Sequence, residues 1–363
     1  MVTRANVKGR RWKGLVLLGL VAALLVAIAG CGGDDDDDAG ADAGAGEGLE
    51  QVEMIIPFPP SIALLGLLMA TENGYFEDEG IDLATVVASE GSGQVNQQLL
   101  AGNQTYGRSG PDLTMIANSQ GFDQRMIAVF ARGIFTIEAP VGSGIESMED
   151  LRGKSLGITD QAGGEVGLVN QALGIAGLEE GTDVELKVVG PGGPASFTAL
   201  RDGDIDAYAG ATNDFAAMDA EGLESVSIVP EELRGLPSNG FAIMQESLDD
   251  EGTADTAVKI IRAWLKGDLF GRENPDEALE IACNAVPEEC QDPDVAQAFF
   301  DRSVEVATPP EGLRPGEPAP LSAFETIQDA LIQNGDIDGP IDLEAAFPQT
   351  YVDAYNEGLE EGL

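Results

Sequence analysis

The chain has 363 residues, no histidine and three cysteines, and its 64 acidic and 19 basic residues give a formal net charge of −45. The lack of histidine excludes Ser-His-Asp and Cys-His catalysis and all histidine-based metal sites. The negative charge disfavours nucleic acid as a partner, because phosphates would be repelled. A chain of this length exceeds one ordinary core, so two domains are predicted.

The first 30 residues are predicted to be a signal peptide. Basic residues precede an apolar run over residues 15–29, which is too short to span a bilayer comfortably as a helix. The sequence Ile28-Ala29-Gly30-Cys31 then resembles a bacterial lipobox, in which the cysteine is acylated and becomes the new N-terminus. The resemblance implies an extracytoplasmic protein held at the membrane by a lipid on Cys31. A simple signal peptide with a chance cysteine, or an uncleaved anchor helix, is the alternative.

Residues 31–50 are predicted to be a disordered acidic tether. Five consecutive aspartates, residues 34–38, precede a stretch of alanine, glycine and aspartate that has no large apolar side chain. Such a segment cannot bury a core, and its own charge extends it. Five consecutive aspartates also lack the spacing of an EF-hand loop.

Strands and helices then alternate along the chain. Residues 52–58 and 81–87 are predicted strands, and Ser61 can cap a helix between them that Gly74 ends. Further strands are predicted at 126–130, 134–137, 155–159, 184–189, 206–209 and 226–229, and helices at 94–101, 165–176, 195–201 and 214–220. Strands separated by helices of this length predict parallel βαβ units.

After a strand at 241–244 the chain is predicted to be helical, with a proline-rich loop over residues 309–320. Cys283 and Cys290 lie in this part of the chain. If Cys31 carries lipid, these two remain as a pair in an oxidising compartment, which favours a disulfide that closes a small loop across Pro287. Two free thiols are the alternative, because spacing alone does not fix their geometry.

Four sequence blocks in order resemble the solute-binding proteins for nitrate, sulfonates, taurine and thiamine-pyrimidine precursors. The blocks are NGYF with EGIDL at residues 73–83, QLLAG at 98–102, DLRGKSLGI at 150–158 and LRDGDIDA at 200–207. The family usually has an aspartate shortly after the second block, where this chain has Gln104-Thr105-Tyr106 instead. The likeness covers roughly residues 52–280.

The resemblance implies an α/β fold of the type II periplasmic-binding class with two lobes and a helical C-terminal extension. Residues 51–136 and 241–363 would form lobe 1, and residues 137–240 would form lobe 2. A small solute would be trapped between the lobes and delivered to an ABC permease with its ATPase. A monomer without cofactor or metal is expected.

The loops that follow strands are the predicted ligand site, because α/β sheets bind ligands at the carboxyl ends of their strands, where helix N-termini offer free N–H groups. A plain connection is the alternative for each loop. The predicted ligand residues are Pro59, Ser61, Ser89, Glu90, Ser92, Ser109, Gly163, Gly164, Glu165, Ser196, Tyr208, Asn213 and Asp214.

Charge in these loops favours a nitrogenous solute over an anion. Glu165 and Asp214 can accept hydrogen bonds from an amine or amino-heterocycle, although either can also simply cap its own helix. Residues 212–214 and Glu165 are similar to the pyrimidine-precursor binders of the family. The aromatic ring of Tyr208 or Phe215 could stack on a solute, or could belong to the core.

Import of a nitrogenous solute has two open alternatives, and a third, an enzyme, is not expected. The first is the same role for a sulfonate, taurine or nitrate, for which basic candidates are few; Arg108, expected after the third strand, and Arg132, near the hinge, are two of them. The second is a surface sensor or scaffold. The third is an enzyme like the branch of the fold that makes the thiamine pyrimidine, but that branch consumes its own histidine, which this chain lacks.

Overall fold

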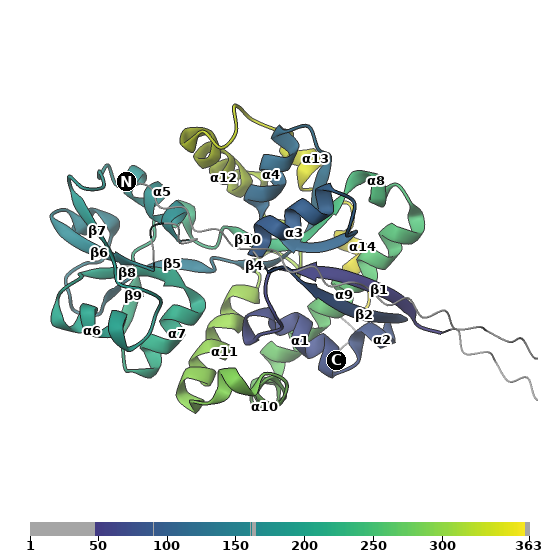
Figure 1. Ribbon diagram of the computed structural model, residues 1–363, viewed down its shortest axis with the longest axis horizontal. Coiled ribbons are helices and arrows are strands. Elements are labelled where there is room, and N and C mark those ends of the chain that lie inside the picture. Colours follow the sequence, from purple (N-terminus) through teal and green to yellow (C-terminus); the bar gives the residue numbers. More distant parts are fainter. Residues whose placement is uncertain (1–47, 90, 160, 162–164, 360–363) are drawn as a thin grey trace, which may run out of the picture. The chain divides into compact units, whose positions relative to one another are not determined.

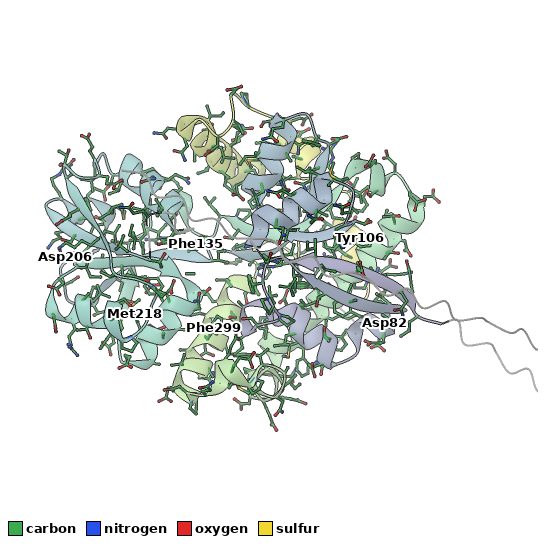
Figure 2. All side chains as sticks on the ribbon, in the orientation of Figure 1. Asp82, Tyr106, Phe135, Asp206, Met218 and Phe299 are labelled. Carbon is green, nitrogen blue, oxygen red and sulfur yellow. A yellow bond between two sulfur atoms is a disulfide. The ribbon has the colours of Figure 1, made fainter. Side chains whose placement is uncertain are left out.

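The computed structural model describes residues 48–359, except 90, 160 and 162–164. Their strands form two five-stranded sheets, here called sheet A and sheet B (Figure 1). The chain passes from sheet A to sheet B between β4 (Gln124–Arg132) and β5 (Phe135–Pro140). It returns between β9 (Ser225–Ser227) and β10 (Pro237–Met244). Figure 2 labels Phe135, the first residue of sheet B.

Sheet A has the strand order β2-β1-β3-β10-β4. Strand β1 (Glu50–Ile56) pairs in parallel with β2 (Ile81–Val87) and β3 (Tyr106–Ser109), whereas β10 runs antiparallel to β3 and β4. The remaining elements along this part of the chain are η1 (Ile62–Leu64), α1 (Leu65–Glu72), α2 (Tyr75–Asp78), α3 (Gly91–Leu100) and α4 (Pro111–Ser119).

Alternating side chains on β1 explain how sheet A is covered on both faces. Met54 and Ile56 pack with α1 and with the long helix α9 (Glu251–Glu273), while Ile55 packs with α3. Trp264 of α9 stacks on Phe130 of β4, with ring centroids 4.3 Å apart. Both faces of the sheet are therefore buried, which suits its apolar strands.

Sheet B has the order β7-β6-β8-β5-β9. Strands β6 (Lys154–Ile158), β7 (Val184–Val188) and β8 (Ala207–Ala211) are parallel, and β5 runs antiparallel to β8 and β9. Helix α5 (Val166–Ile175) packs on one side, and α6 (Pro194–Asp202) and α7 (Thr212–Ala220) pack on the other (Figure 1). Two short 3-10 helices, η2 (Met148–Leu151) and η3 (Glu231–Leu233), complete this part.

The remaining elements belong to the helical tail. They are α8 (Gln245–Leu248), α10 (Pro275–Ala285), η4 (Pro287–Cys290), α11 (Pro293–Ala307), α12 (Leu321–Asn334), α13 (Leu343–Ala346) and α14 (Val352–Asn356). Cys283 and Cys290 form a disulfide, as predicted. None of the helices in the described part of the chain is both long and apolar enough to cross a membrane.

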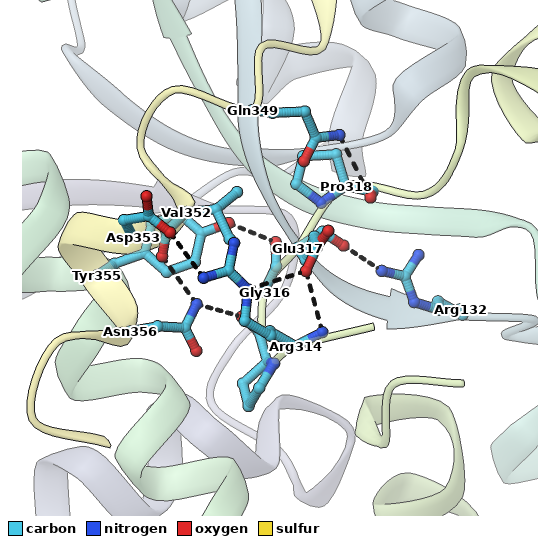
Figure 3. Close-up of polar contacts among 11 residues, drawn as sticks. Arg132, Arg314, Gly316, Glu317, Pro318, Gln349, Val352, Asp353, Tyr355 and Asn356 are labelled. Carbon is cyan, nitrogen blue, oxygen red and sulfur yellow. Dashed lines mark hydrogen bonds and ion pairs between the residues drawn. The ribbon is translucent and has the colours of Figure 1, made fainter. Parts of the chain in front are cut away.

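The proline-rich loop of the tail covers an edge of sheet A. The amide of Val129 on β4 donates to the carbonyl of Gly316 at 2.9 Å, and Arg132 donates to the carbonyl of Glu317. Tyr355 donates to Gly316 from the other side at 2.9 Å (Figure 3). Because β4 is an edge strand, this segment satisfies groups that would otherwise be open to another chain.

The predicted parallel units are present in both sheets. Each sheet also contains an antiparallel strand that was not predicted, because β5 and β10, which adjoin the two crossings, run against their neighbours. The helix expected at 94–101 begins at Gly91, and α4, which was not predicted, begins at Pro111. Proline at a first helical position is favourable, so this Gly-Pro pair starts a helix rather than forming only a turn.

Candidate functional site

The carboxyl ends of the parallel strands lead into helix starts in both sheets. In sheet A, β1 leads to η1 and β3 leads to α4; in sheet B, β6 precedes α5 and β8 leads directly into α7. These are the positions at which α/β sheets bind ligands. Glu90, Gly163 and Gly164 of the predicted site, and the predicted lipid site Cys31, lie outside the described residues.

Asp214 joins two segments of sheet B. Its Oδ2 accepts a hydrogen bond from the amide of Ala211 at 2.8 Å, and its Oδ1 accepts one from the amide of Gly192 at 2.7 Å. The side chain is buried, and burial raises the pKa of Asp214, with a further contribution from the charge of Glu165. Gly192 must be glycine, because a Cβ there would lie 2.1 Å from the main chain of Asp214.

Glu165 precedes α5 and is 2% exposed. Its Oε1 accepts hydrogen bonds from the amide of Thr159 at 2.8 Å and from the hydroxyl of Thr159 at 2.6 Å. The carboxylate therefore ties the start of α5 to the end of β6. Both predicted acidic residues are brought to the carboxyl edge of sheet B, and both already accept hydrogen bonds from the main chain.

Two more predicted residues hold the same 190–193 loop that Asp214 holds. The buried Ser196 hydroxyl accepts from the amide of Gly193 at 2.9 Å, and Tyr208 donates to the carbonyl of Gly190 at 3.0 Å. The Tyr208 ring is fully buried and meets Phe215 edge-on, with centroids 5.5 Å apart. Both rings are thus part of the core of sheet B. Asn213, between Thr212 and Asp214, is exposed.

The predicted residues of sheet A are in more varied surroundings. Ser61 caps η1 through the amide of Ala63 at 3.2 Å, as expected. Pro59 and Ser89 are exposed, and the Ser89 hydroxyl donates to Gln94 at 3.3 Å. The half-buried Ser92 lies in α3, whereas the hydroxyl of Ser109 at the end of β3 is buried without a hydrogen-bond partner.

Sequence reasoning missed one residue at the start of η1. Glu289, in the loop that the disulfide closes, accepts a hydrogen bond from the amide of Ile62 at 2.8 Å. The two residues are 227 positions apart, so the only available signal was an acidic residue inside the predicted cysteine loop. In sheet A a carboxylate thus accepts from the first N–H group of a helix, whereas the carboxylates of sheet B accept from residues that precede their helices.

The arginines expected at the site differ in their partners. Arg108 lies in β3 itself rather than after it, is 4% exposed, and its Nε has no hydrogen-bond partner. Its guanidinium carbon lies 5.8 Å from the ring centroid of Phe58, in the loop after β1. Arg132 donates to Glu317, and burial lowers its pKa to about 10. Arg132, the last residue of β4, thus binds the proline-rich segment where the chain leaves sheet A.

Helix α11 connects the two sheets through an arginine that was not predicted. Arg302 pairs with Glu138 of β5 at 3.0 Å and with Asp219 of α7 at 2.6 Å. The same helix packs against η1 and α1 through Phe299 and Phe300. The two ion pairs raise the pKa of Arg302 above its usual value despite burial. Elements from both sheets are thereby joined beside the crossing.

Two of the cavities beside the crossing have similar volumes. One of about 310 Å³ is lined by Arg132, Phe135, Thr136, Glu138 and Arg302, and one of about 320 Å³ by Phe135, Leu168, Gln171, Ser238 and Leu331. Neither includes a described side chain of the predicted ligand site. Within the part of the chain that the structure describes, no cluster of acidic, cysteine or histidine residues is arranged to hold a metal.

Comparison with known proteins matches this chain to one family model and to several curated relatives. The family model described as "NMT1/THI5 like" matches residues 61–278. The riboflavin-binding protein RibY of Chloroflexus aurantiacus is 24% identical over 252 residues, which cover 66% of this chain and 68% of that protein. The 4-amino-5-hydroxymethyl-2-methylpyrimidine phosphate synthase of Legionella pneumophila is 26% identical over 232 residues, covering 61% and 69%.

Two solved structures are similar in fold. The aliphatic sulphonate binding protein SsuA from Escherichia coli superposes with a TM-score of 0.61 at 16% identity, covering 83% of this chain and 92% of that one. The nitrate-binding protein NrtA from Synechocystis superposes with a TM-score of 0.59 at 13% identity, covering 87% and 90%. The two mixed sheets with C-terminal helices are the periplasmic-binding-protein type II fold.

Proposed function

Because this chain belongs to the NMT1/THI5-like family, we propose that it is the extracytoplasmic solute-binding protein of an ABC importer. It traps a small nitrogenous solute, of the amino-pyrimidine or related heterocycle class, between a lobe built on sheet A and a lobe built on sheet B. It then delivers the solute to a permease and its ATPase. A lipid on Cys31 holds the protein at the membrane.

The proposed class of solute rests on the acidic side chains that lie at the helix starts. Glu165, Asp214 and Glu289 accept hydrogen bonds from the main-chain N–H groups of Thr159, Ala211 and Ile62, so a carboxylate rather than a cation stands at each of these helix starts. Each carboxylate oxygen can accept more than one hydrogen bond. The same side chains can therefore accept hydrogen bonds from the N–H groups of an amino-heterocycle. The names of two relatives, which refer to riboflavin and to an aminopyrimidine, agree with this class.

Binding rather than catalysis is proposed, although one relative is named a synthase. The chain has no histidine to act as acid, base or nucleophile. Import of a sulfonate or nitrate is the second candidate function. The likeness in fold to the sulphonate-binding and nitrate-binding proteins, together with the buried cation Arg108, favours it.

A thermal-shift screen followed by calorimetric titration tests the proposed function. Heterocycles with exocyclic amines, riboflavin, taurine and nitrate would be added to the mature chain, since a ligand of the folded form raises the melting temperature. We expect a heterocycle to bind, and Glu165→Gln to weaken it tenfold or more. Glu185→Gln, an exposed acid on β7, is the matched control. Tight binding of taurine or nitrate without any heterocycle would contradict the proposal.

Two further measurements address transport and anchoring. Uptake of the identified solute by cells should require the protein, whereas a sensor or scaffold would leave uptake unchanged. Mass spectrometry of the membrane fraction should detect acyl chains on Cys31, and Cys31→Ala should release the protein from that fraction. Retention of Cys31→Ala at the membrane would contradict the lipid anchor.

A further inference from the structure

Arg108 is a buried cation whose guanidinium has an unpartnered nitrogen. It is 4% exposed, its Nε is buried without a partner, and it forms no hydrogen bond or ion pair with the described chain. Buried guanidinium groups are ordinarily paired, because an unpaired buried charge is costly. Some group outside the described residues is therefore expected to meet this cation.

The position of Arg108 places it at the edge where a ligand would bind. Tyr106, labelled in Figure 2, lies two residues earlier on the same face of β3. It is buried, and its hydroxyl donates to the carbonyl of Thr253. Arg108 lies two residues nearer the carboxyl end of β3 than Tyr106, beside Phe58 of the loop after β1. Phe58 is itself 36% exposed, so the guanidinium lies next to a residue that solvent reaches.

Other unsatisfied polar atoms lie at the same edge. The hydroxyl of Ser109 is buried without a partner, and so is the Oδ1 of Asn239 on the neighbouring strand β10. Strand register pairs Ser109 with Gly240, the residue that follows Asn239. Successive side chains on a strand alternate in direction, so Ser109 faces the opposite side of the sheet from Arg108. These two atoms add polar groups at the edge of the sheet but provide no partner for Arg108.

Asp268 of α9 does not satisfy Arg108. Its charge acts on Arg108, but Asp268 Oδ2 is itself buried without a hydrogen-bond partner. Burial raises the pKa of Asp268 well above its usual value, which favours its neutral form. Burial lowers the pKa of Arg108 to about 10, so the guanidinium still carries its charge at neutral pH.

We propose that Arg108 binds an oxyanion group carried by the solute, such as a phosphate, carboxylate or sulfonate. This inference rests on the proposed function and deepens it. The planar guanidinium can donate two parallel hydrogen bonds to such a group. The nitrogenous end of the solute then faces Glu165 and Asp214 of sheet B. The solute is accordingly amphoteric, with its acidic end toward lobe 1 and its N–H groups toward lobe 2.

Matched pairs of compounds test the inference on the mature full chain. The probes are 4-amino-5-hydroxymethyl-2-methylpyrimidine with its phosphate ester, and riboflavin with its 5′-phosphate. We expect the phosphate ester of a bound pair to bind at least tenfold more tightly than its parent, and Arg108→Gln to reduce that preference below threefold. Arg125→Gln, which removes a β4 arginine that already has Gln245 and Asp123 as partners, should leave the preference unchanged.

Inorganic phosphate provides a second readout that does not depend on the heterocycle. At matched ionic strength, phosphate should raise the melting temperature of the wild type and of Arg125→Gln but not of Arg108→Gln. This result without any bound heterocycle would support the oxyanion site and contradict the proposed solute class. Equal phosphate shifts in Arg108→Gln and wild type, or an undiminished preference for the phosphate ester, would overturn the role of Arg108 while leaving the proposed function intact.

The stability of the unliganded protein separates a ligand site from a structural ion pair. Removing an unpaired buried charge should leave the melting temperature of Arg108→Gln equal to or above that of the wild type. A lower melting temperature together with an unchanged phosphate preference would mean that Arg108 serves only the fold with Asp268, and would overturn the proposal.

Discussion

The helix starts at β1 and β8 satisfy their main-chain N–H groups in different ways. At β8, the carboxylate comes from Asp214, within the first turn of the helix itself. At β1, one hydroxyl comes from the adjacent Ser61, but the carboxylate comes from Glu289, 227 residues away in the disulfide loop. The first arrangement is local, whereas the second depends on the C-terminal helices being in place.

The helix start in sheet B is therefore held by residues nearby in the chain, and the helix start in sheet A by a distant segment. In sheet B, Asp214, Ser196 and Tyr208 hold the 190–193 loop with contacts made inside one compact stretch of chain. In sheet A, the segment after β1 relies on a distant loop. If the two helix starts are held in these different ways, substitutions at Asp214, at the two cysteines and at Glu289 should have different effects.

Asp214→Ala should have the largest effect. It leaves the amides of Ala211 and Gly192 without their acceptor, and we expect a loss of about 2–4 kcal/mol in the free energy of unfolding. Urea denaturation measures it. The exposed neighbour Asn213→Ala should change stability by less than about 0.5 kcal/mol. Equal effects of the two substitutions would mean that Asp214 does not hold the loop.

Replacement of both Cys283 and Cys290 by serine should come next. The disulfide closes a short loop, for which chain entropy predicts a loss of about 2–3 kcal/mol. Because Glu289 lies in this loop, hydrogen exchange at the amide of Ile62 should also accelerate. Unchanged protection of Ile62 would show that the loop holds Glu289 in place without the disulfide.

Glu289→Ala should cost about 1 kcal/mol, the typical value of one cap hydrogen bond. Glu288→Ala, at the exposed neighbouring position, is the control. In the chain that already lacks the disulfide, Glu289→Ala should cost less, because a mobile loop no longer presents the carboxylate. A full, additive cost in both backgrounds would contradict the link between the disulfide and the cap.

The finest test is the pH dependence of Asp214. Burial raises its pKa in the folded state above the usual 3.8, so the folded chain retains a proton that the unfolded chain has lost. Its contribution to stability is therefore present at low pH and is lost as the pH rises through the folded pKa. The free energy of unfolding of wild type minus that of Asp214→Asn should fall over this window. A rise with pH would show that the pKa is lowered instead.

Much of the fold followed from local patterns, and the exceptions have identifiable causes. Ser61 and the strand at Ile81–Val87 were predicted because a cap and an apolar run are local signals. The direction of β10 was not predicted, because side-chain alternation is the same in parallel and antiparallel strands. Helix α4 was missed because Gly110-Pro111 is also typical of a turn.

The site was less predictable than the fold. Glu165 and Asp214 were identified from their place after strands, but Glu289 could not be, since no sequence pattern connects it to Ile62. Arg108 was identified from the sequence as one of few basic residues near the site. Its burial without a partner could not be predicted, because it depends on how distant elements pack against β3.

The strand order has a consequence for how the chain folds as it is made. Sheet B uses only residues between Phe135 and Ser227, so all of its strands are available before β10 has emerged from the ribosome. Sheet A must wait, because β10 inserts between β3 and β4, and Tyr355 holds the segment that covers the β4 edge. Sheet B, in the middle of the polypeptide, can thus fold first. The two separate segments that build sheet A, β1–β4 and β10, can pair only later.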